Sequence, residues 1–306
     1  MPFLQGSCQY TLALLGCLWS LQISATQLPA LVDSTWLAQH ANSVVILDVR
    51  SRKDFLEAHW PKSRWAGFNE LEWQTERYDL PGYLPDKDQL ATLFGKLGLT
   101  CAETVVVIGS AAQSKKIAEA SRVVWSLMIS GFKQVALLDG GIESIERNKL
   151  SQNETVFAPS DCAIDFQTNL LADTNRVEDL IDNNQPVIDI RPTLYFEGYK
   201  RDPRVPQGGT IYDGVGIPPE KLLDMSSGIF LSKEQLRQAF KQYDIPTDGS
   251  LATFSDTGIW GALGWFVIHQ ILQNSKAQLY DGSMVEWIDR GGEVHDSTDD
   301  MGGPIG

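Results

Sequence analysis

Short runs of β-branched and aliphatic residues alternate with amphipathic stretches along most of the chain. The runs Val44–Val49, Thr104–Ile108 and Gln134–Leu138 predict strands, and Lys115–Ser130 between the last two predicts a helix. This order predicts an α/β domain with a mostly parallel sheet. Ligands of such sheets bind beyond the carboxyl ends of the strands, so residues that directly follow a strand are the first candidates for a site.

The hydrophobic pattern occurs twice in the chain. "VVILDVRSRKDF" with Asp48 recurs as "PVIDIRPTLYF" with Asp189, 141 positions later (189 − 48). "QVALLDGG" with Asp139 recurs as "AQLYDGS" with Asp281, 142 positions later (281 − 139). Two landmarks with nearly the same offset indicate two copies of one fold. The expected organisation is a domain at 28–148, a polar linker at 149–169, a second domain at 170–290 and a disordered tail at 291–306.

The beginning of the chain has a different composition from the rest. Tyr10–Leu21 is mostly apolar and is followed by Ile-Ser-Ala ending at Ala25, which predicts a secretory signal at 1–25. The apolar run is shorter than the roughly 20 residues that span a bilayer, so we expect no membrane span. The protein is therefore predicted to be exported, to the periplasm if bacterial. Cys17 in "LLGC" leaves lipid anchoring as the alternative, and the first 49 residues lack the Lys or Arg of an ordinary signal.

Charge and cysteine content exclude several classes of function. The chain has 306 residues and a formal net charge of −14, which disfavours binding to nucleic acid. Without the signal only Cys101 and Cys162 remain, which are too few for a zinc site, so we expect no metal. The two cysteines are either a disulfide or two free thiols, and their separation in sequence decides neither.

One loop combines the features of an anion site. "TFSDTGIWGALGWFVIHQIL" predicts a strand at Leu251–Phe254, a loop that begins at Ser255 and an apolar helix. Backbone N–H groups of such a loop can converge at a helix N-terminus and stabilise an anion. The residues that would supply them are Asp256, Thr257, Gly258, Ile259 and Trp260. Gly109 or Ser110 takes the corresponding place in the first copy, within "IGSAAQSKK".

These ordered motifs resemble the rhodanese family of sulfurtransferases in its tandem-domain form. The similar segments are "DVRSRKDFLEAHWP" and "SRVVWSLMISGFKQVALLDGG" in the first copy, and "VIDIR", "GGTIYDGVGIPPEKLLD" and "LYDGSMVEW" in the second. The resemblance covers nearly all of the chain after the predicted signal. It implies two tandem rhodanese-like domains, each a mostly parallel sheet flanked by helices, and a reaction that needs no cofactor.

The resemblance also implies that Ser255 stands where active members carry the cysteine that accepts sulfur as a persulfide. A serine hydroxyl is a much weaker acid than a thiol and cannot form a persulfide. Asp256 would also place a negative charge beside a thiolate at this position and repel an anionic donor. We therefore expect a homologue without persulfide chemistry that binds a small, thiosulfate-like sulfur oxyanion or a protein partner. The alternative is an active thiosulfate or 3-mercaptopyruvate sulfurtransferase.

Other polar or aromatic residues near the loop have two possible roles each. Asp189 is expected to accept backbone hydrogen bonds and hold the loop, rather than to act as a catalytic carboxylate. Arg191 either attracts an anionic sulfur donor or forms a salt bridge at the sheet edge. Trp260 either walls a pocket or anchors the helix in the core. His269, on the apolar helix, is expected to be structural, and no G-x-S-x-G elbow surrounds Ser255 to indicate a hydrolase.

Overall fold

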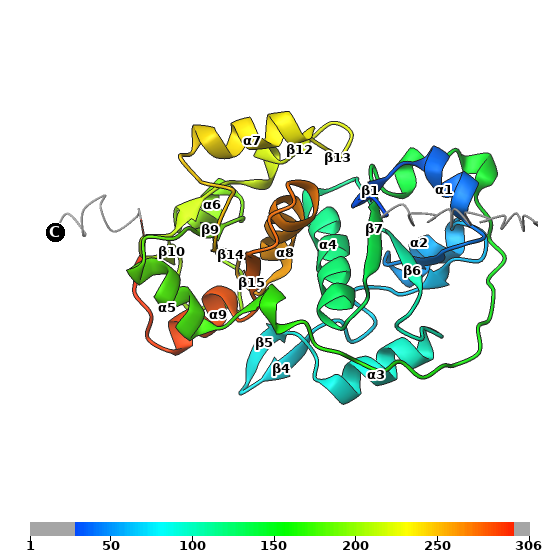
Figure 1. Ribbon diagram of the computed structural model, residues 1–306, viewed down its shortest axis with the longest axis horizontal. Helices are drawn as coiled ribbons and strands as arrows, with labels where there is room; N and C mark the ends of the chain where they lie inside the picture. The colour runs from blue at the N-terminus through cyan, green and yellow to red at the C-terminus, as the bar shows by residue number, and fades with distance from the viewer. Residues whose placement is uncertain (1–27, 297–306) are drawn as a thin grey trace, which may run out of the picture.

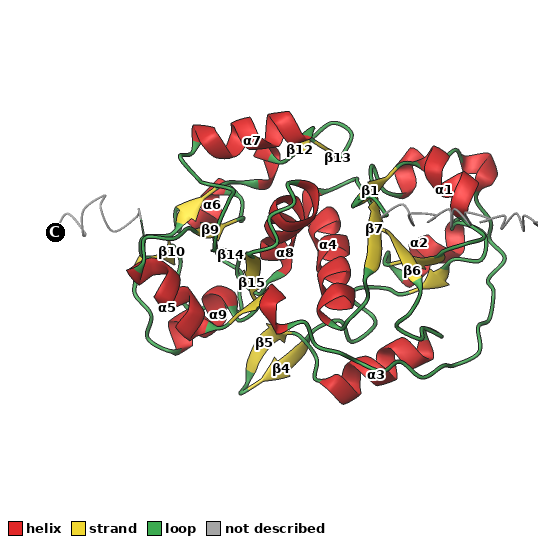
Figure 2. Ribbon diagram, in the orientation of Figure 1, coloured by secondary structure: helices red, strands yellow, loops and turns green. Residues whose placement is uncertain are grey.

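The computed structural model describes residues 28–296, which form two α/β domains side by side (Figure 1). The predicted signal at 1–25 and the end of the predicted tail lie outside these residues. Each domain contains a five-stranded sheet in which every strand pairing is parallel. Figure 2 shows helices beside the strands of both sheets. The α/β fold with two tandem domains and mostly parallel sheets is therefore confirmed.

The first domain has the strand order β1-β7-β6-β2-β3, and a short hairpin, β4–β5, extends from it. The strands are β1 (Leu31–Val32), β2 (Val45–Asp48), β3 (Arg64–Trp65), β4 (Thr75–Arg77), β5 (Leu80–Tyr83), β6 (Thr104–Ile108) and β7 (Gln134–Leu138). The helices are α1 (Ser34–His40), α2 (Arg52–Glu57), α3 (Lys87–Lys96), α4 (Ser114–Ile129), and the 3₁₀ turns η1 (Ile142–Ser144) and η2 (Arg147–Lys149).

The second domain repeats this topology in the order β8-β15-β14-β9-β11. Its strands are β8 (Leu171–Ala172), β9 (Val187–Asp189), β10 (Thr210–Ile211), β11 (Val215–Gly216), β12 (Leu223–Asp224), β13 (Ile229–Phe230), β14 (Leu251–Phe254), β15 (Ala277–Tyr280) and β16 (Val294–His295). Its helices are α5 (Thr174–Asp182), α6 (Thr193–Phe196), α7 (Lys233–Gln242), α8 (Ile259–Trp265) and α9 (Ser283–Asp289), with 3₁₀ turns η3 (Thr168–Leu170) and η4 (Pro219–Lys221). A π-helix, η5 (Phe266–Ile271), continues α8.

The duplication extends to individual hydrogen bonds. Arg50 donates from its backbone N–H to Asp48 at 3.1 Å, and Arg191 donates in the same way to Asp189 at 2.9 Å. In both domains the arginine side chain also forms a salt bridge with the same aspartate. An Asp-X-Arg sequence at the end of a strand therefore builds the same turn twice, because the carboxylate satisfies the backbone and the guanidinium together.

The two domains share a large part of their cores. Helices α4 and α8 lie against each other at the centre of the molecule (Figure 1). Buried side chains from both domains, among them Val124 of α4 and Leu263 of α8, belong to one hydrophobic cluster. Both helices are apolar on most sides because each packs against its own sheet and against the other helix.

The linker and the C-terminal segment have more fixed contacts than their sequences suggest. The linker has no helix or strand between residues 152 and 167, yet it packs on the first domain, where Ile164 is buried and Cys162 forms a disulfide with Cys101. The predicted tail was wrong for residues 291–296, because β16 pairs with β10 in an antiparallel ladder. The tail from Gly291 was predicted to be disordered because it contains Asp299 and Asp300 among glycines. Trp287, however, donates its indole N–H to the Glu293 carbonyl at 2.8 Å and holds the start of this segment.

Candidate functional site

The loop after β14 has the geometry of a strand-to-helix turn. Ser255 follows the strand directly, and Gly258 at the N-terminal cap of α8 adopts a left-handed backbone with φ of 76°. The carbonyl groups of the loop turn toward α9, where Ser255 accepts a hydrogen bond from the Met284 N–H at 2.9 Å and Asp256 accepts one from Val285 at 3.2 Å. Because their carbonyls are held in this way, the amides of the loop point elsewhere.

Five backbone N–H groups of this loop have no partner among the described residues. Within residues 28–296, no hydrogen bond is donated by the backbone N–H of Asp256, Thr257, Gly258, Ile259 or Trp260. These are the groups that the sequence predicted to converge. Consecutive free amides at the start of a helix carry partial positive charge and favour an anion.

Ser255 carries one of three buried side-chain polar atoms that lack a hydrogen-bond partner among the described residues, the others being Arg122 Nε and Ser126 Oγ. The Ser255 side chain is fully buried. Its backbone N–H, by contrast, donates to Ser283 Oγ at 3.2 Å. A buried hydroxyl without a partner is costly, and native proteins rarely retain one without a functional reason.

The carboxylate of Asp256 belongs to a buried cluster of charged side chains. Arg191 donates from Nη1 to Asp256 at 2.8 Å and from Nη2 to Asp189 at 2.6 Å, and it also reaches the Gly209 carbonyl. Burial raises the pKa of Asp256, and the neighbouring Arg191 only partly opposes this shift. Of the two roles considered for Arg191, the structure shows the salt bridge. Its single positive charge faces two carboxylates, so the cluster has one more acidic side chain than basic ones.

Two arginines that sequence reasoning missed also reach the loop. Arg122, from α4 of the first domain, is fully buried, approaches the Gly258 carbonyl at 3.5 Å and forms an ion pair with Asp281. Arg204 lies 3.4 Å from Thr257 Oγ1 and pairs with Asp202 at 2.8 Å. Nothing in the local sequence singles out Arg122, because its partner is 159 positions away.

The β4–β5 hairpin of the first domain covers the loop. Gln74 donates to the Thr257 carbonyl at 2.8 Å, and a Cβ added at Gly82 would lie 2.6 Å from Thr257 Cβ. The exposed fractions of Ser255, Asp256, Thr257 and Ile259 are 0%, 5%, 2% and 7%. Trp260 is partly buried and packs against the large core cluster, which is the anchoring role. The loop is therefore covered by protein and shielded from solvent.

The corresponding loop of the first domain is already occupied by a side chain. Glu143 accepts hydrogen bonds from Ser110 Oγ at 2.6 Å and from the Ala111 N–H at 2.8 Å. A carboxylate of the protein itself therefore takes the place of an external anion. Only the second domain, among the described residues, keeps both the loop amides and the serine hydroxyl free.

The remaining candidates lie away from the loop. His269, on η5, stacks on Trp265 with ring centroids 4.7 Å apart, and burial lowers its pKa to about 4. Cys101 and Cys162 form a disulfide, which settles the question that their sequence positions left open. Residues 28–296 contain no group of His, Cys, Asp and Glu side chains placed to hold a metal ion, and no helix there is long and apolar enough to span a bilayer.

Comparison with known proteins places this geometry in a family. Residues 32–148 match the profile of the rhodanese-like domain. Mouse 3-mercaptopyruvate sulfurtransferase is 26% identical to the chain over 292 residues, which cover 87% of the chain and 94% of the mouse protein. A thiosulfate/3-mercaptopyruvate sulfurtransferase of Arabidopsis thaliana is 28% identical over 77% of the chain and 66% of the plant protein. The chain therefore contains a rhodanese-like domain at residues 32–148, and it is similar to sulfurtransferases over most of its length.

A solved structure has the same fold as this chain. The anaerobic ergothioneine biosynthesis enzyme from Chlorobium limicola superposes with a TM-score of 0.76 at 16% identity, over 87% of this chain and 70% of that enzyme. At this identity the superposition shows the fold alone. The curated sequence relatives are sulfurtransferases, and a putative thiosulfate sulfurtransferase of Haloferax volcanii also covers 84% of the chain at 26% identity.

Proposed function

We propose that this rhodanese-like protein is an exported homologue of sulfurtransferases that binds a small sulfur oxyanion without persulfide chemistry of its own. The observation that carries the proposal is Ser255, whose buried hydroxyl and the five loop amides that follow it have no partner in residues 28–296. In a cysteine-based sulfurtransferase, a thiolate at this position takes sulfur from thiosulfate and releases sulfite. A serine oxygen cannot take that sulfur, so only the binding half of the reaction remains.

The cysteines of the described residues support the loss of persulfide chemistry. Cys101 and Cys162 are bonded to each other, so neither offers a thiol to replace Ser255. The burial of the loop also favours a small anion over a protein partner, since residues 255–259 are almost inaccessible from the surface. Binding is expected to be weak, because the nearby arginines are all paired with carboxylates.

Thiocyanate formation from thiosulfate and cyanide tests the proposal. The wild-type protein should form none above the buffer rate, whereas Ser255→Cys should gain turnover and a persulfide adduct visible by mass. The thiolate at position 255 would accept the outer sulfur of thiosulfate as sulfite leaves, and cyanide would then remove that sulfur as thiocyanate. The loop amides would lower the pKa of the new thiol.

Ser110→Cys is the matched control for this experiment. It places a thiol at the same position of the first domain, where Glu143 already occupies the loop and would raise the pKa of the thiol. This variant should remain inactive. Thiocyanate formation by the wild type, with both Cys101 and Cys162 replaced by alanine, would overturn the proposal in favour of an active sulfurtransferase.

Export is the second part of the proposal, and it rests on the apolar run at Tyr10–Leu21 and on the Ile-Ser-Ala sequence that ends at Ala25. The disulfide supports it, because such bonds persist in oxidising compartments. Mass spectrometry of the protein from its native host should find an N-terminus near Thr26. An N-terminal lipid at Cys17 would favour anchoring, and an intact Met1 in the cytosol would refute export.

A further inference from the structure

The peptide groups of the Ser255 loop are held in place through their carbonyl oxygens. The Ser255 and Asp256 carbonyls accept hydrogen bonds from backbone N–H groups of α9, and the Gly258 carbonyl accepts one from α8 at 3.1 Å. These three backbone donors belong to the second domain, as the loop does. The Thr257 carbonyl differs, because no backbone N–H of residues 28–296 donates to it.

Gln74 of the first domain supplies the donor that the Thr257 carbonyl lacks. Its Nε2 lies 2.8 Å from the Thr257 carbonyl oxygen and 2.8 Å from the Gly82 carbonyl oxygen. Both partners are acceptors, so they identify the NH₂ end of the side chain, which has two hydrogens to donate. One hydrogen therefore holds the β4–β5 hairpin of the first domain, and the other holds the loop of the second.

The hydrogen bond from Gln74 also fixes the direction of the next amide in the loop. A trans peptide group is planar, with its C=O and its N–H on opposite sides. Because the Thr257 carbonyl points to Gln74, the Gly258 N–H points away from it, and none of the described residues accepts a hydrogen bond from this N–H. Gly258 has φ of 76°, and glycine tolerates many backbone conformations, so the residue does not select this orientation by itself.

We propose that Gln74 is a positioning residue of the anion site, which holds the Gly258 amide in the orientation that binds an anion. This role rests on the proposed function of the Ser255 loop. Gln74 and Thr257 are 183 positions apart and lie in different domains, so the site requires both domains. The first domain thereby takes part in the site, although Glu143 occupies its own loop.

The pKa of a thiol at position 255 reports the direction of the loop amides without any added anion. Ser255→Cys supplies the thiol, and its pKa is measured from the ultraviolet absorbance of the thiolate, as the difference from the matching protein that retains Ser255. Gln74→Met keeps the length of the side chain but removes its donor, so in the Ser255→Cys protein it should raise the pKa of the thiol by about one unit. Without the Ser255 substitution, Gln74→Met should weaken the binding of thiosulfate roughly fivefold, measured by calorimetry.

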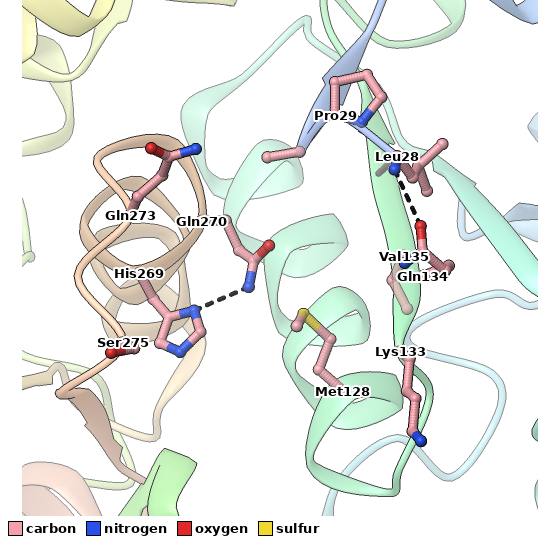
Figure 3. A pocket seen from close by; sticks show the side chains of 11 residues that line it. Leu28, Pro29, Met128, Lys133, Gln134, Val135, His269, Gln270, Gln273 and Ser275 are labelled. Carbon is pink, nitrogen blue, oxygen red and sulfur yellow. Dashed lines mark hydrogen bonds between the residues drawn. The ribbon is translucent and has the colours of Figure 1, made fainter. Parts of the chain in front are cut away.

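Gln270→Met is the matched control for this experiment. Gln270 is half-buried like Gln74, and its Nε2 lies 2.8 Å from a partner in the second domain, His269 Nδ1 (Figure 3). It belongs to η5, which continues α8, and its place 12 residues after Gly258 (270 − 258) puts it roughly 15 Å from the loop along the helix axis. Gln270→Met should leave both the pKa of the thiol and the affinity for thiosulfate unchanged.

Gln74→Ala also lacks the donor and should raise the pKa of the thiol in the same way, which separates the lost hydrogen bond from the fit of the methionine side chain. An unchanged pKa in both Gln74 variants, or an equal rise with Gln270→Met, would show that Gln74 does not position the amide. A raised pKa in the Gln74 variants, combined with no binding of thiosulfate by the wild type, would contradict the proposed function and leave the role of Gln74 in place.

Discussion

Ser255 and Asp256 are neighbours in sequence but face different surroundings. The Ser255 hydroxyl has no partner among the described residues, whereas the Asp256 carboxylate is held by Arg191 in a cluster with Asp189. Two other buried or half-buried ion pairs lie at the loop, Arg122 with Asp281 and Arg204 with Asp202. Each pair contains one basic and one acidic side chain. The partial positive charge of the loop amides is therefore opposed by the excess carboxylate of the Asp189, Arg191 and Asp256 cluster, and Asp256 is the member of the cluster that belongs to the loop.

Asp256→Asn should strengthen anion binding at the loop. Removing the carboxylate brings the cluster of Asp189, Arg191 and residue 256 to neutrality, which should improve the affinity for thiosulfate roughly tenfold at low salt. The measurement is a thiosulfate titration followed by calorimetry. Asp182→Asn, at an exposed position of α5, changes the net charge equally and should leave the affinity unchanged. Equal effects of the two variants would show that the overall charge, rather than the cluster, governs binding.

At the residue scale, sequence patterns reveal contacts that are local and miss those that are distant. The Asp189–Arg191 turn could be predicted, since both partners lie within three residues and the same pattern occurs at Asp48 and Arg50. The pairing of Asp256 with Arg191 could not, because the two are 65 positions apart. The sequence therefore predicts the loop and its serine, but not the charges that decide how well it binds.

At the scale of elements, each domain covers the loop of the other with a hairpin. Gly82 of β4–β5 contacts Thr257 in the second domain, and Gly228 between β12 and β13 contacts Ala111 in the first. An added Cβ would lie 2.6 Å from Thr257 Cβ in one case and 2.5 Å from the Ala111 carbonyl oxygen in the other. Both hairpins approach so closely because glycine has no side chain.

Gly258→Ala should destabilise the protein more than its backbone conformation alone explains. A Cβ at this position would overlap Arg122 Nη1, and φ of 76° is already unfavourable for alanine. We expect a loss of about 2–3 kcal/mol in the free energy of unfolding, measured with urea. Gly249→Ala is the control, because φ there is 84° but its nearest neighbour is 4.0 Å away. It should cost only about 1 kcal/mol.

A smaller or equal loss for Gly258→Ala would mean that Arg122 moves aside freely. In that case the contact between Arg122 of α4 and Gly258 of the loop would contribute little to stability. The periodicity of the sequence predicted both α4 and the loop, yet the contact between Arg122 and Gly258 needs both domains in place. Elements that lie within one repeat can therefore be predicted, whereas the hairpins and arginines that cross between repeats cannot.

At the scale of the whole molecule, equivalent aspartates tie the domains together in both directions. Asp139 of the first domain accepts a hydrogen bond from the Phe230 N–H at 3.0 Å, and Asp281 of the second accepts one from the Leu84 N–H at 2.7 Å. The motifs that revealed the duplication thus also build the interface between the copies. Together with the shared core of α4 and α8, these contacts make the two domains one structural unit.

The linker is fixed to this unit by the disulfide. Cys101 precedes β6 and Cys162 lies in the linker, 61 positions later, so the bond closes a loop that contains β6, α4 and β7. Cys162→Ser should lower the free energy of unfolding by about 2–4 kcal/mol, because the unfolded chain regains the entropy of that loop. A reductant should lower the melting temperature of the wild type and leave that of Cys162→Ser unchanged.

Cys101→Ser serves as the partner control for this prediction, because a disulfide makes the two single variants and the double variant equally stable. If the double variant is distinctly less stable than either single one, the cysteines contribute as separate buried groups and the bond is not what holds the linker. If reductant leaves the melting temperature of the wild type unchanged, the stability of the fold does not depend on the disulfide, and the disulfide no longer supports export. A melting temperature that falls with reductant in the wild type alone would link the stability of the entire two-domain unit to the oxidising environment that the amino-terminal sequence predicts.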